Sequence, residues 1–417
     1  MGGRDPLSPL TPLPILGEGS WDLDSFGSFS LQHSGGLCYT IPAINLETED
    51  CMRVLCARKD LFEGVQTAGR AVSSRSTLPI LGHLMVRSEE DRLRIAATDL
   101  EIGMECMVQA NIEEHGCMTA PARILTEVLS ALPDSDVAMS VDESNVVNLK
   151  CGASDYTILG LPAEDFPMLP EVKDDVCFKI EKAALREGIK RTIFAVSTEE
   201  ARPQLTGVLL TLSGAGIKLV STDGHRLCLQ ESPIVSGRGE AQAIVPQRAM
   251  AELSRLLTEG EGEIDVNVSA SQILFKVGDI SLVSRLIEGQ FPDFQRVVPT
   301  ECDKKLILPT SDLLQSVRRA AIVARENSNR TVLRTVDGKL VVTAESGSVG
   351  KAYEEVEVVK EGDDMEMAFN AKYLLDVLGV LECEAVEMEL TGSLSPAVVK
   401  GQGSQDYMYV VMPMQIA

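Results

Sequence analysis

Apolar residues recur at every third or fourth position in three pairs of segments, and stretches of alternating apolar and polar residues separate the segments. The first member of each pair opens at Leu61, Leu185 and Leu313, which lie 124 and 128 residues apart. The first spacing is typical of an amphipathic helix, and alternation is typical of a strand with one buried face. The pattern predicts helix, strand pair, helix, strand pair, repeated three times.

Other residues recur at nearly the same interval along the chain. The second helix of each repeat is predicted to begin after Pro121, Pro246 and Asn370, in line with the tolerance for proline in a first helical turn. In the second repeat, 213–216 (Ser-Gly-Ala-Gly) predicts a hairpin turn. Solenoid units run about 20 to 50 residues, so this longer repeat predicts domains instead. We expect three α+β domains, at residues 52–172, 173–300 and 301–417.

Residues 1–51 lack any such period. They are rich in Gly, Pro and Ser and hold one basic residue against seven acidic ones, which predicts disorder. The segment has no charged start followed by an apolar stretch, as a signal peptide would. The periodic pattern begins at Met52, and we expect translation to start there; the alternative is a true extension.

The formal net charge of −24 argues against nucleic acid as a partner only if the charge is spread evenly. Basic residues, however, recur on the predicted helices. Arg186 and Lys190 are four apart, and Arg123 and Arg248 each follow the aligned proline by two residues. Such recurrence favours a shared basic surface over isolated solvated charges, which is the alternative interpretation.

Composition limits the location and the chemistry. Ten cysteines are scattered singly without a CxxC motif, which predicts a reducing, cytoplasmic location. No apolar run reaches the roughly 18 to 20 residues that span a bilayer. The four histidines lie far apart, so no metal site is predicted, and no cofactor is expected.

No catalytic constellation is recognisable. Asp223 and His225 stand close in sequence, but no Ser or Cys lies in a nucleophile setting, so a turn after a strand is the favoured interpretation. The segment 347–351 (Gly-Ser-Val-Gly-Lys) lacks the leading glycine and the final Ser or Thr of a phosphate-binding loop. The sequence therefore predicts a protein that is not an enzyme; a hydrolase using Asp223 and His225 is the alternative.

Seven segments, in order, resemble the bacterial DNA polymerase III beta subunit, the sliding clamp family, and the resemblance runs from Met52 to the C-terminus. They are 77–82, 98–101, 161–167, 222–227, 288–294, 369–376 and 409–414. The resemblance implies a head-to-tail homodimer in which six domains form a closed ring. Helices would line the hole and antiparallel sheets would form the outer wall, so that a basic inner face lies within an acidic shell. Duplex DNA would be held by topology, without dependence on its sequence.

The resemblance also implies DNA-contacting positions at Arg75 and Arg202. Helix placement adds further candidates for the same surface: Arg123, Arg186, Lys190, Arg248, Arg318 and Arg325. Some family members carry aromatic residues just after the position of Arg202. Here 203–204 is Pro-Gln, which departs from that pattern and offers no aromatic ring for stacking at this place.

A partner-peptide pocket between the second and third domains is likewise implied. Its residues would be Leu205, Thr222, Gly224, His225, Arg226, Leu227, Pro292, Arg296, Val297, Tyr373, Leu394, Val410, Val411, Met412, Pro413 and Met414. Aliphatic side chains and adaptable methionines suit the apolar residues of an extended peptide. Pro396 and the C-terminal 415–417 depart from the family pattern and are expected to alter peptide preference.

For ring closure, the resemblance implies Tyr156 and Ile158 in the first domain and Ile322 and Val323 in the third. The expected function is a processivity clamp that binds double-stranded DNA, the DNA polymerase III alpha subunit, a clamp loader, and other polymerases and repair factors. Two alternatives stay open: a paralogous clamp for repair or drug resistance, and a peptide-binding scaffold that never encircles DNA.

Overall fold

The computed structural model describes residues 21–23, 29–32, 38–41, 52–73, 78–172, 176–299 and 301–416, in two compact units, Met1–Glu49 and Asp50–Ala417. In the first unit three short strands pair antiparallel in the order β1 (Trp21–Leu23), β2 (Phe29–Gln32), β3 (Cys38–Ile41). Disorder was the sequence prediction for this segment. It stays a prediction, since apart from these three strands the segment lies outside the described residues.

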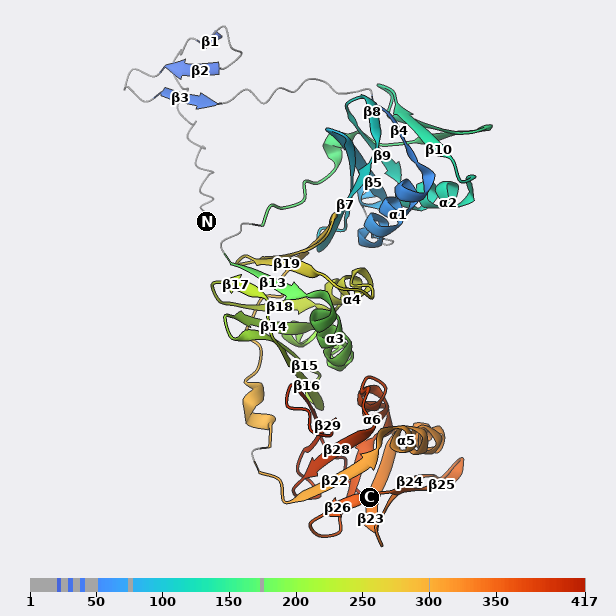
Figure 1. Ribbon diagram of the computed structural model, residues 1–417, viewed down its shortest axis with the longest axis vertical. Coiled ribbons are helices and arrows are strands. Elements are labelled where there is room, and N and C mark those ends of the chain that lie inside the picture. Colours follow the sequence, from blue (N-terminus) through green and yellow to red (C-terminus); the bar gives the residue numbers. More distant parts are fainter. Residues whose placement is uncertain are drawn as a thin grey trace, which may run out of the picture. The chain divides into compact units, whose positions relative to one another are not determined.

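The second unit contains the predicted threefold repeat, which is confirmed (Figure 1). Its helices are α1 (Arg58–Ala68), α2 (Ala122–Ala131), α3 (Lys182–Thr192), α4 (Gln247–Leu256), α5 (Thr310–Ala324) and α6 (Ala371–Leu378). Each begins directly after a strand. Pro121 and Pro246 precede α2 and α4, and the Asn370 side chain caps α6 by accepting a 3.0 Å hydrogen bond from the Lys372 backbone N–H.

The strands follow the same repeat. Those of the first domain are β4 (Met52–Ala57), β5 (His83–Glu89), β6 (Arg92–Thr98), β7 (Ile102–Gln109), β8 (Asn111–Glu114), β9 (Cys117–Pro121), β10 (Asp136–Val141), β11 (Val146–Cys151) and β12 (Ser154–Leu159). Those of the second are β13 (Cys177–Glu181), β14 (Gly207–Ser213), β15 (Gly216–Thr222), β16 (Arg226–Ser232), β17 (Ser236–Arg238), β18 (Ala241–Pro246), β19 (Glu263–Val268), β20 (Gln272–Val277) and β21 (Ile280–Arg285). Those of the third are β22 (Lys304–Pro309), β23 (Arg330–Val336), β24 (Lys339–Ser346), β25 (Gly350–Glu357), β26 (Val359–Glu361), β27 (Glu366–Asn370), β28 (Ala385–Leu390), β29 (Ala397–Gly401) and β30 (Tyr407–Val411).

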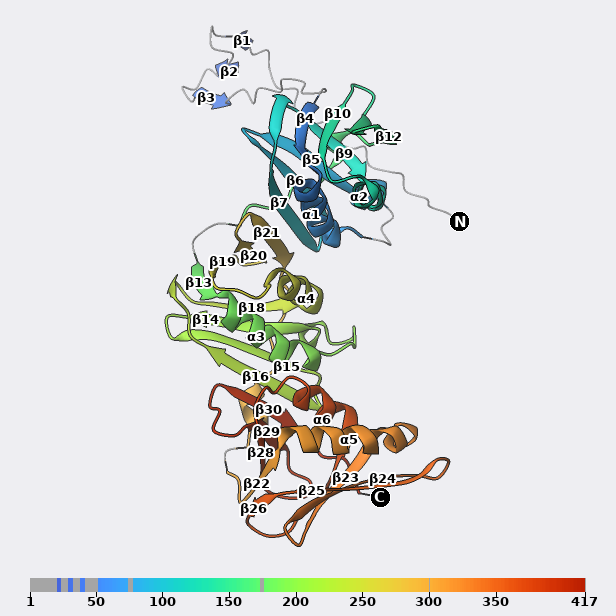
Figure 2. The same cartoon turned by 45° about the vertical axis from the view of Figure 1, so that its right-hand side comes forward.

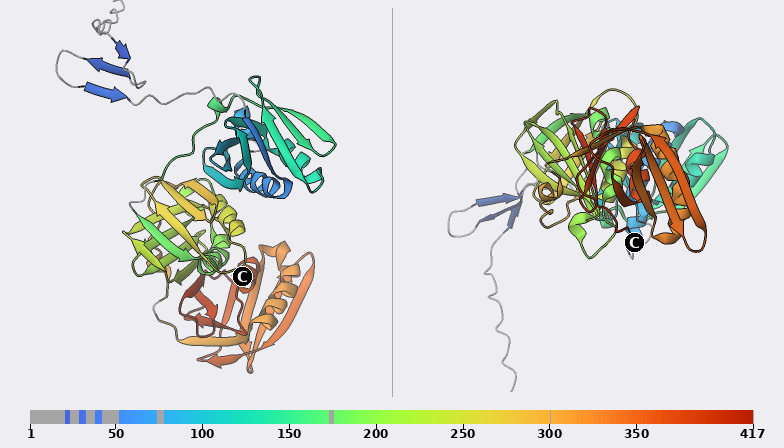
Figure 3. Two further views of the ribbon diagram at one scale, coloured as in Figure 1. Left: turned by 45° about the horizontal axis from the view of Figure 1, so that its top comes forward. Right: turned by 90° about the horizontal axis from the view of Figure 1, so that it is seen from below.

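Continuous sheets join the domains. One nine-stranded sheet runs β17-β13-β19-β20-β21-β7-β6-β5-β9, so β21 of the second domain pairs with β7 of the first. Another runs β18-β14-β15-β16-β30-β29-β28-β22-β26, so β30 of the third domain pairs with β16 of the second, where red strands lie beside green ones (Figure 3). The two smaller sheets of this unit are β12-β11-β10-β4-β8 and β25-β24-β23-β27, with edge strands β12 and β8 in the first and β25 and β27 in the second.

The two joints use the same register. Leu282 of β21 faces Met104 of β7, and Tyr409 of β30 faces Cys228 of β16. Leu282 and Tyr409 are equivalent to Tyr156 of β12. Within their own domains, Leu282 faces Phe275, Tyr409 faces Val399 and Tyr156 faces Leu149. On the opposite strand of each joint, Met104 of β7 and Cys228 of β16 occupy positions equivalent to Tyr353 of β25, which faces Thr343 within its own domain. By these equivalences, β12 and β25 are the two strands that correspond to a third joint of the same kind, which a single chain does not form.

Cores form where the helices cover the sheets. Leu61 and Val65 of α1, Leu185 and Ile189 of α3, and Leu313 of α5 are all fully buried, as the apolar spacing predicted. In Figures 1 and 2 the six helices of the second unit lie on the same side of its sheets. The opposite faces of the sheets carry the linkers and the cavities at the domain joints.

Candidate peptide pocket and nucleic-acid interface

A cavity of about 180 Å³ opens where the second and third domains join. Its floor is apolar, because Leu205, Leu227 and Val410 are buried there. The interdomain linker supplies one wall through a 3-10 turn, η6 (Phe294–Val297). Nine of the predicted pocket residues line this cavity: Leu205, Thr222, Gly224, Arg226, Leu227, Pro292, Val297, Val410 and Met412.

The other predicted residues do not line this cavity. These are His225, Arg296, Tyr373, Leu394, Val411, Pro413 and Met414. Arg296 forms a surface ion pair with Asp293 at 2.9 Å, and Leu394 is 75% exposed. The backbone N–H of Met414 bonds the Ala368 carbonyl, which ties the end of the chain to β27.

Three lining residues were missed as pocket residues from the sequence: Arg202, Asp293 and Phe294. Asp293 and Phe294 fall within 288–294, one of the segments that carried the family resemblance, so the signal was available. Arg202 was predicted to contact DNA. The structure places it at the mouth of the cavity, where its guanidinium donates to Glu199 at 2.6 Å and to the Asp223 carbonyl at 3.4 Å.

The turn from Thr222 to Arg226 forms the rim of the cavity. The Thr222 hydroxyl donates to the Arg226 carbonyl at 2.6 Å and accepts from the Gly224 N–H at 3.1 Å. The Asp223 carboxylate accepts from the backbone N–H groups of His225 and Arg226. Asp223 is therefore engaged in holding the turn, as the turn interpretation predicted.

Arg226 ties the rim to the third domain. Its side chain is only 7% exposed, and it donates to Asp223 at 3.1 Å, to Asp376 of α6 at 2.6 Å and to the Phe194 carbonyl at 2.7 Å. The guanidinium also lies 4.4 Å from the centre of the Tyr373 ring. Burial opposes the charge, but Tyr409 and Asp376 outweigh it and raise the pKa of Arg226. Arg226 therefore stays charged and holds the pocket and the domain joint together.

Five of the predicted DNA-contacting residues lie on the α-helices, and four of these five pair with acidic side chains. Arg186 and Lys190 of α3 pair with Glu259 and Glu382, both largely exposed. Arg123 of α2 pairs with Glu127 at 2.8 Å and is 86% exposed. Exposed pairs of this kind contribute little to stability, so phosphate groups can replace the carboxylates.

The remaining predicted DNA contacts differ in their surroundings. Arg248 of α4 pairs with Asp99 across the joint between the first and second domains. Arg318 lies on α5 within hydrogen-bond range of Gln315, and Arg325 opens the 3-10 turn η7 (Arg325–Asn327) that follows α5. Arg75 lies outside the described residues.

The predicted interface residues lie at the two open ends of the repeat. Tyr156 on β12 is 39% exposed, whereas Ile158 on the same strand is buried in the first core. Ile322 on α5 is 64% exposed, and the neighbouring Val323 packs partly against the third core. Tyr156 and Ile322 are thus available to a partner, and Ile158 serves the core of its own domain.

Family models of the DNA polymerase III beta subunit match the chain three times over: the N-terminal domain at residues 52–170, the central domain at 179–293 and the C-terminal domain at 295–415. The chain belongs to this family. A beta sliding clamp from Pseudomonas putida is 36% identical over 369 residues, which cover 88% of this chain and all of the relative. A beta sliding clamp from Staphylococcus aureus is 31% identical over 83% of this chain and 94% of its own.

Solved sliding-clamp structures share the fold. The DNA polymerase sliding clamp from Bacillus subtilis is 28% identical with a TM-score of 0.85. A sliding clamp from Pseudomonas aeruginosa bound to griselimycin is 35% identical with a TM-score of 0.83. Each match covers 88% of this chain and all of the other. Beta sliding clamps are non-catalytic processivity factors of DNA replication whose three-domain chains close as dimeric rings.

Two other findings bear on the site. Across the described ranges, no helix combines the length and apolarity needed to cross a membrane. In the same part of the chain, no group of three or more His, Cys, Asp or Glu side chains is arranged to hold a metal ion.

Proposed function

We propose that this chain is a replicative sliding clamp, which closes with a second copy around duplex DNA and tethers the DNA polymerase. The observation that carries the proposal is the match of all three domains to the beta subunit family, together with the edge strands β12 and β25. Two different edges on one chain favour a head-to-tail closure, which leaves no free sheet edge at the joint.

The internal repeat supports a specific register for this closing joint. Because Tyr156 is equivalent to Leu282 and Tyr409, and Tyr353 to Met104 and Cys228, Tyr156 is proposed to face Tyr353 of the partner subunit. Both tyrosines are exposed within one chain, at 39% and 61%, as residues awaiting a partner would be. Ile322 of α5 is proposed to pack beside the same joint. Aromatic cross-strand pairs stabilise such joints by up to about 1 kcal/mol each.

The DNA is proposed to lie along the helices. There the recurring basic residues would meet phosphates without reading bases: Arg123, Arg186, Lys190, Arg248, Arg318 and Arg325. Weak and exchangeable phosphate contacts permit sliding, and the ring prevents escape. Arg75 and Arg202 remain part of the proposal by family resemblance alone.

The cavity of about 180 Å³ is proposed to receive short peptide segments of partner proteins. The partners would be the polymerase III alpha subunit, the clamp loader, and other polymerases and repair factors, which would compete for one apolar pocket. We place this action in the cytoplasm, in accord with the free thiols at Cys56, Cys106 and Cys228.

The proposal is tested by retention on DNA. The protein is loaded by a clamp loader onto nicked circles, and half of the sample is then linearised with a restriction enzyme. Retention on circles with rapid loss from linear ends is the expected result, because only a topological link depends on free ends. Equal retention on both forms would contradict encirclement and favour a peptide-binding scaffold that never encloses DNA.

A further inference from the structure

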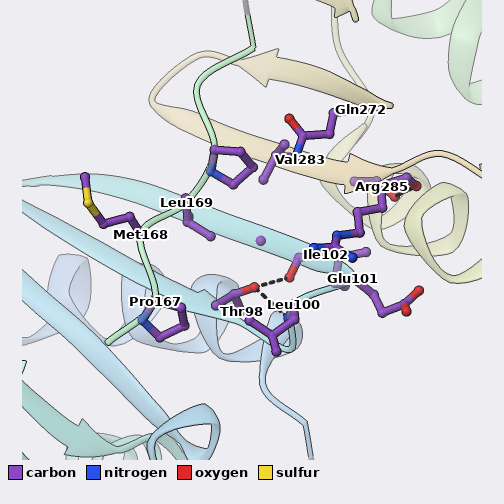
Figure 4. A pocket seen from close by; sticks show the side chains of 13 residues that line it. Thr98, Leu100, Glu101, Ile102, Pro167, Met168, Leu169, Gln272, Val283 and Arg285 are labelled. Carbon is purple, nitrogen blue, oxygen red and sulfur yellow. Dashed lines mark hydrogen bonds between the residues drawn. The ribbon is translucent and has the colours of Figure 1, made fainter. Parts of the chain in front are cut away.

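A second cavity, of about 160 Å³, lies at the joint between the first and second domains (Figure 4). It is lined by the turn between β6 and β7, by the end of β21 and by the linker from Pro167 to Pro170. Its position matches that of the partner pocket one repeat later, where the turn between β15 and β16, the end of β30 and the next linker meet.

The two rims are built by the same hydrogen bonds. The Thr98 hydroxyl donates to the Ile102 carbonyl at 2.8 Å and accepts from the Leu100 N–H at 3.0 Å, as Thr222 does with Arg226 and Gly224. Asp99 accepts from the N–H groups of Glu101 and Ile102, as Asp223 does from the equivalent residues. The first cavity is thus a repeat-equivalent of the partner pocket, and not an accidental gap.

One residue on this rim has an unfavourable backbone conformation. Leu100 has φ +77°, and its equivalent at the other joint is Gly224 with φ +92°. Glycine adopts positive φ freely, whereas a leucine there is strained. The Leu100 side chain is also 46% exposed, so it gains little from burial in return. A strained and exposed apolar side chain at a cavity rim indicates a role in binding.

A second large apolar side chain stands on the same rim. Met168 of the linker is 94% exposed and points away from the cavity floor in Figure 4. Its neighbour Leu169 instead packs against the bare backbone of Gly103: one Leu169 methyl lies 2.4 Å from the place that a Cβ on Gly103 would take. Leu169 and Val283 thereby form an apolar floor, while Met168 and Leu100 remain free to contact a ligand.

The positive charge of Arg285 indicates which class of ligand the first cavity would bind. The Arg285 side chain lies at the mouth of the cavity, and no ion pair or hydrogen bond within the described ranges engages its guanidinium. An acidic group on a ligand would complement it, whereas at the other joint the equivalent position is the apolar Met412. The two cavities should therefore prefer different ligands.

We propose that the joint between the first and second domains is a second peptide-binding groove. It would take an extended segment with a large apolar side chain between Leu100 and Met168 and an acidic side chain on Arg285. The proposal rests on the clamp function only through the equivalence of the two joints. DNA retention does not involve this groove, so the two proposals fail independently.

The probe is a fluorescein-labelled peptide, Gly-Asp-Leu-Phe-Leu amide, and its binding is followed by fluorescence anisotropy. The full chain carries Met412→Glu, which places a charge in the partner pocket and closes it to apolar side chains. Binding that persists in this background is expected to weaken about fivefold on Leu100→Gly and on Met168→Ala. A peptide with Lys in place of Asp should bind about tenfold more weakly, and Arg285→Gln should remove that difference.

Thermal unfolding separates binding from a structural role. Leu100→Gly relieves the strained backbone, so the melting temperature of this variant should rise while its affinity for the peptide falls. A residue with a purely structural role would not change the two quantities in opposite directions. Val359→Ala, another exposed apolar residue at 64%, is the matched control and should change neither quantity. The proposal is overturned if the Met412→Glu chain binds no peptide, or if its binding is unaffected by both rim substitutions.

Discussion

At the scale of single residues, Arg226 carries the joint between the second and third domains. Its side chain is nearly buried, donates hydrogen bonds to two carboxylates and a backbone carbonyl, and lies over an aromatic ring. Removing one partner of a buried ion network leaves charges without compensation. Arg226→Met should therefore reduce the free energy of unfolding by about 3 kcal/mol and weaken peptide binding in the pocket.

Urea unfolding of the two proteins would measure that loss, with Arg296→Met as the matched control. Arg296 forms an exposed pair with Asp293 and is 84% exposed, so its removal should cost less than about 1 kcal/mol. Equal losses for the two variants would contradict a special role for Arg226.

A second residue-scale prediction concerns pH. Burial raises the pKa of the Cys228 thiol from 9.0 to about 12. The folded state thus keeps this proton more tightly than the unfolded chain. The associated stability is complete below pH 9 and is lost as the pH rises towards 12. From pH 8 to pH 10 the wild type should lose about 1.4 kcal/mol more than Cys228→Ala, measured by urea unfolding. Parallel losses in the two proteins would refute the assignment.

At the scale of elements, α3 is proposed to present its basic residues Arg186 and Lys190 to DNA. Arg186 and Lys190 pair only with exposed carboxylates, which phosphates can displace. Replacing both by Ala should lower the slope of log affinity against log salt by about 1.8, or about 0.9 for each lost phosphate contact. Titration of short duplex DNA at several salt concentrations measures the slope. Lys218→Ala on β15, a strand of the sheet, is the control and should leave it unchanged.

The repeat of α2 and α4 predicts an ion pair across the closing joint. Arg248 of α4 pairs with Asp99 of the preceding domain. Arg123 is its equivalent on α2, and Glu345 aligns with Asp99, so Arg123 should meet Glu345 of the partner subunit. Arg123→Glu should weaken the dimer about fivefold, and adding Glu345→Arg should restore it. Sedimentation equilibrium measures the dissociation constant. A double variant as weak as the single one would exclude this pair.

At the scale of the whole molecule, the proposed clamp function depends on closing the ring between β12 of one chain and β25 of its partner. Tyr156→Asp places a charge on the β12 edge, where Tyr156 is proposed to face Tyr353 of the partner subunit. The variant should sediment as a monomer at micromolar concentration and leave nicked circles quickly. Its melting temperature should change little, because Tyr156 is 39% exposed in the single chain. Val359→Asp on β26 is the control and should remain dimeric. A dimeric Tyr156→Asp protein would contradict the proposed register.

Much of this architecture was readable in the sequence. The spacing of Leu185 and Ile189 predicted α3, and the turn at 213–216 predicted the hairpin of β14 and β15, because both signals are local and periodic. The phase of the landmarks predicted three similar domains. Nine of the residues that the family resemblance predicted for a pocket line one cavity, since they cluster in a few short segments.

Only the tertiary structure decided the rest. The pairing of β21 with β7, the bond from Arg226 to Asp376 and the packing of Leu169 on Gly103 join residues that are 66 to 182 positions apart. Contacts at such separations leave no periodic trace in either partner. Nor does the sequence reveal that Leu100 takes a conformation suited to glycine, because the surrounding hydrogen bonds impose it against the local preference. Local patterning thus determined the elements and their repetition, whereas long-range packing decided which edges join and which cavities stay open.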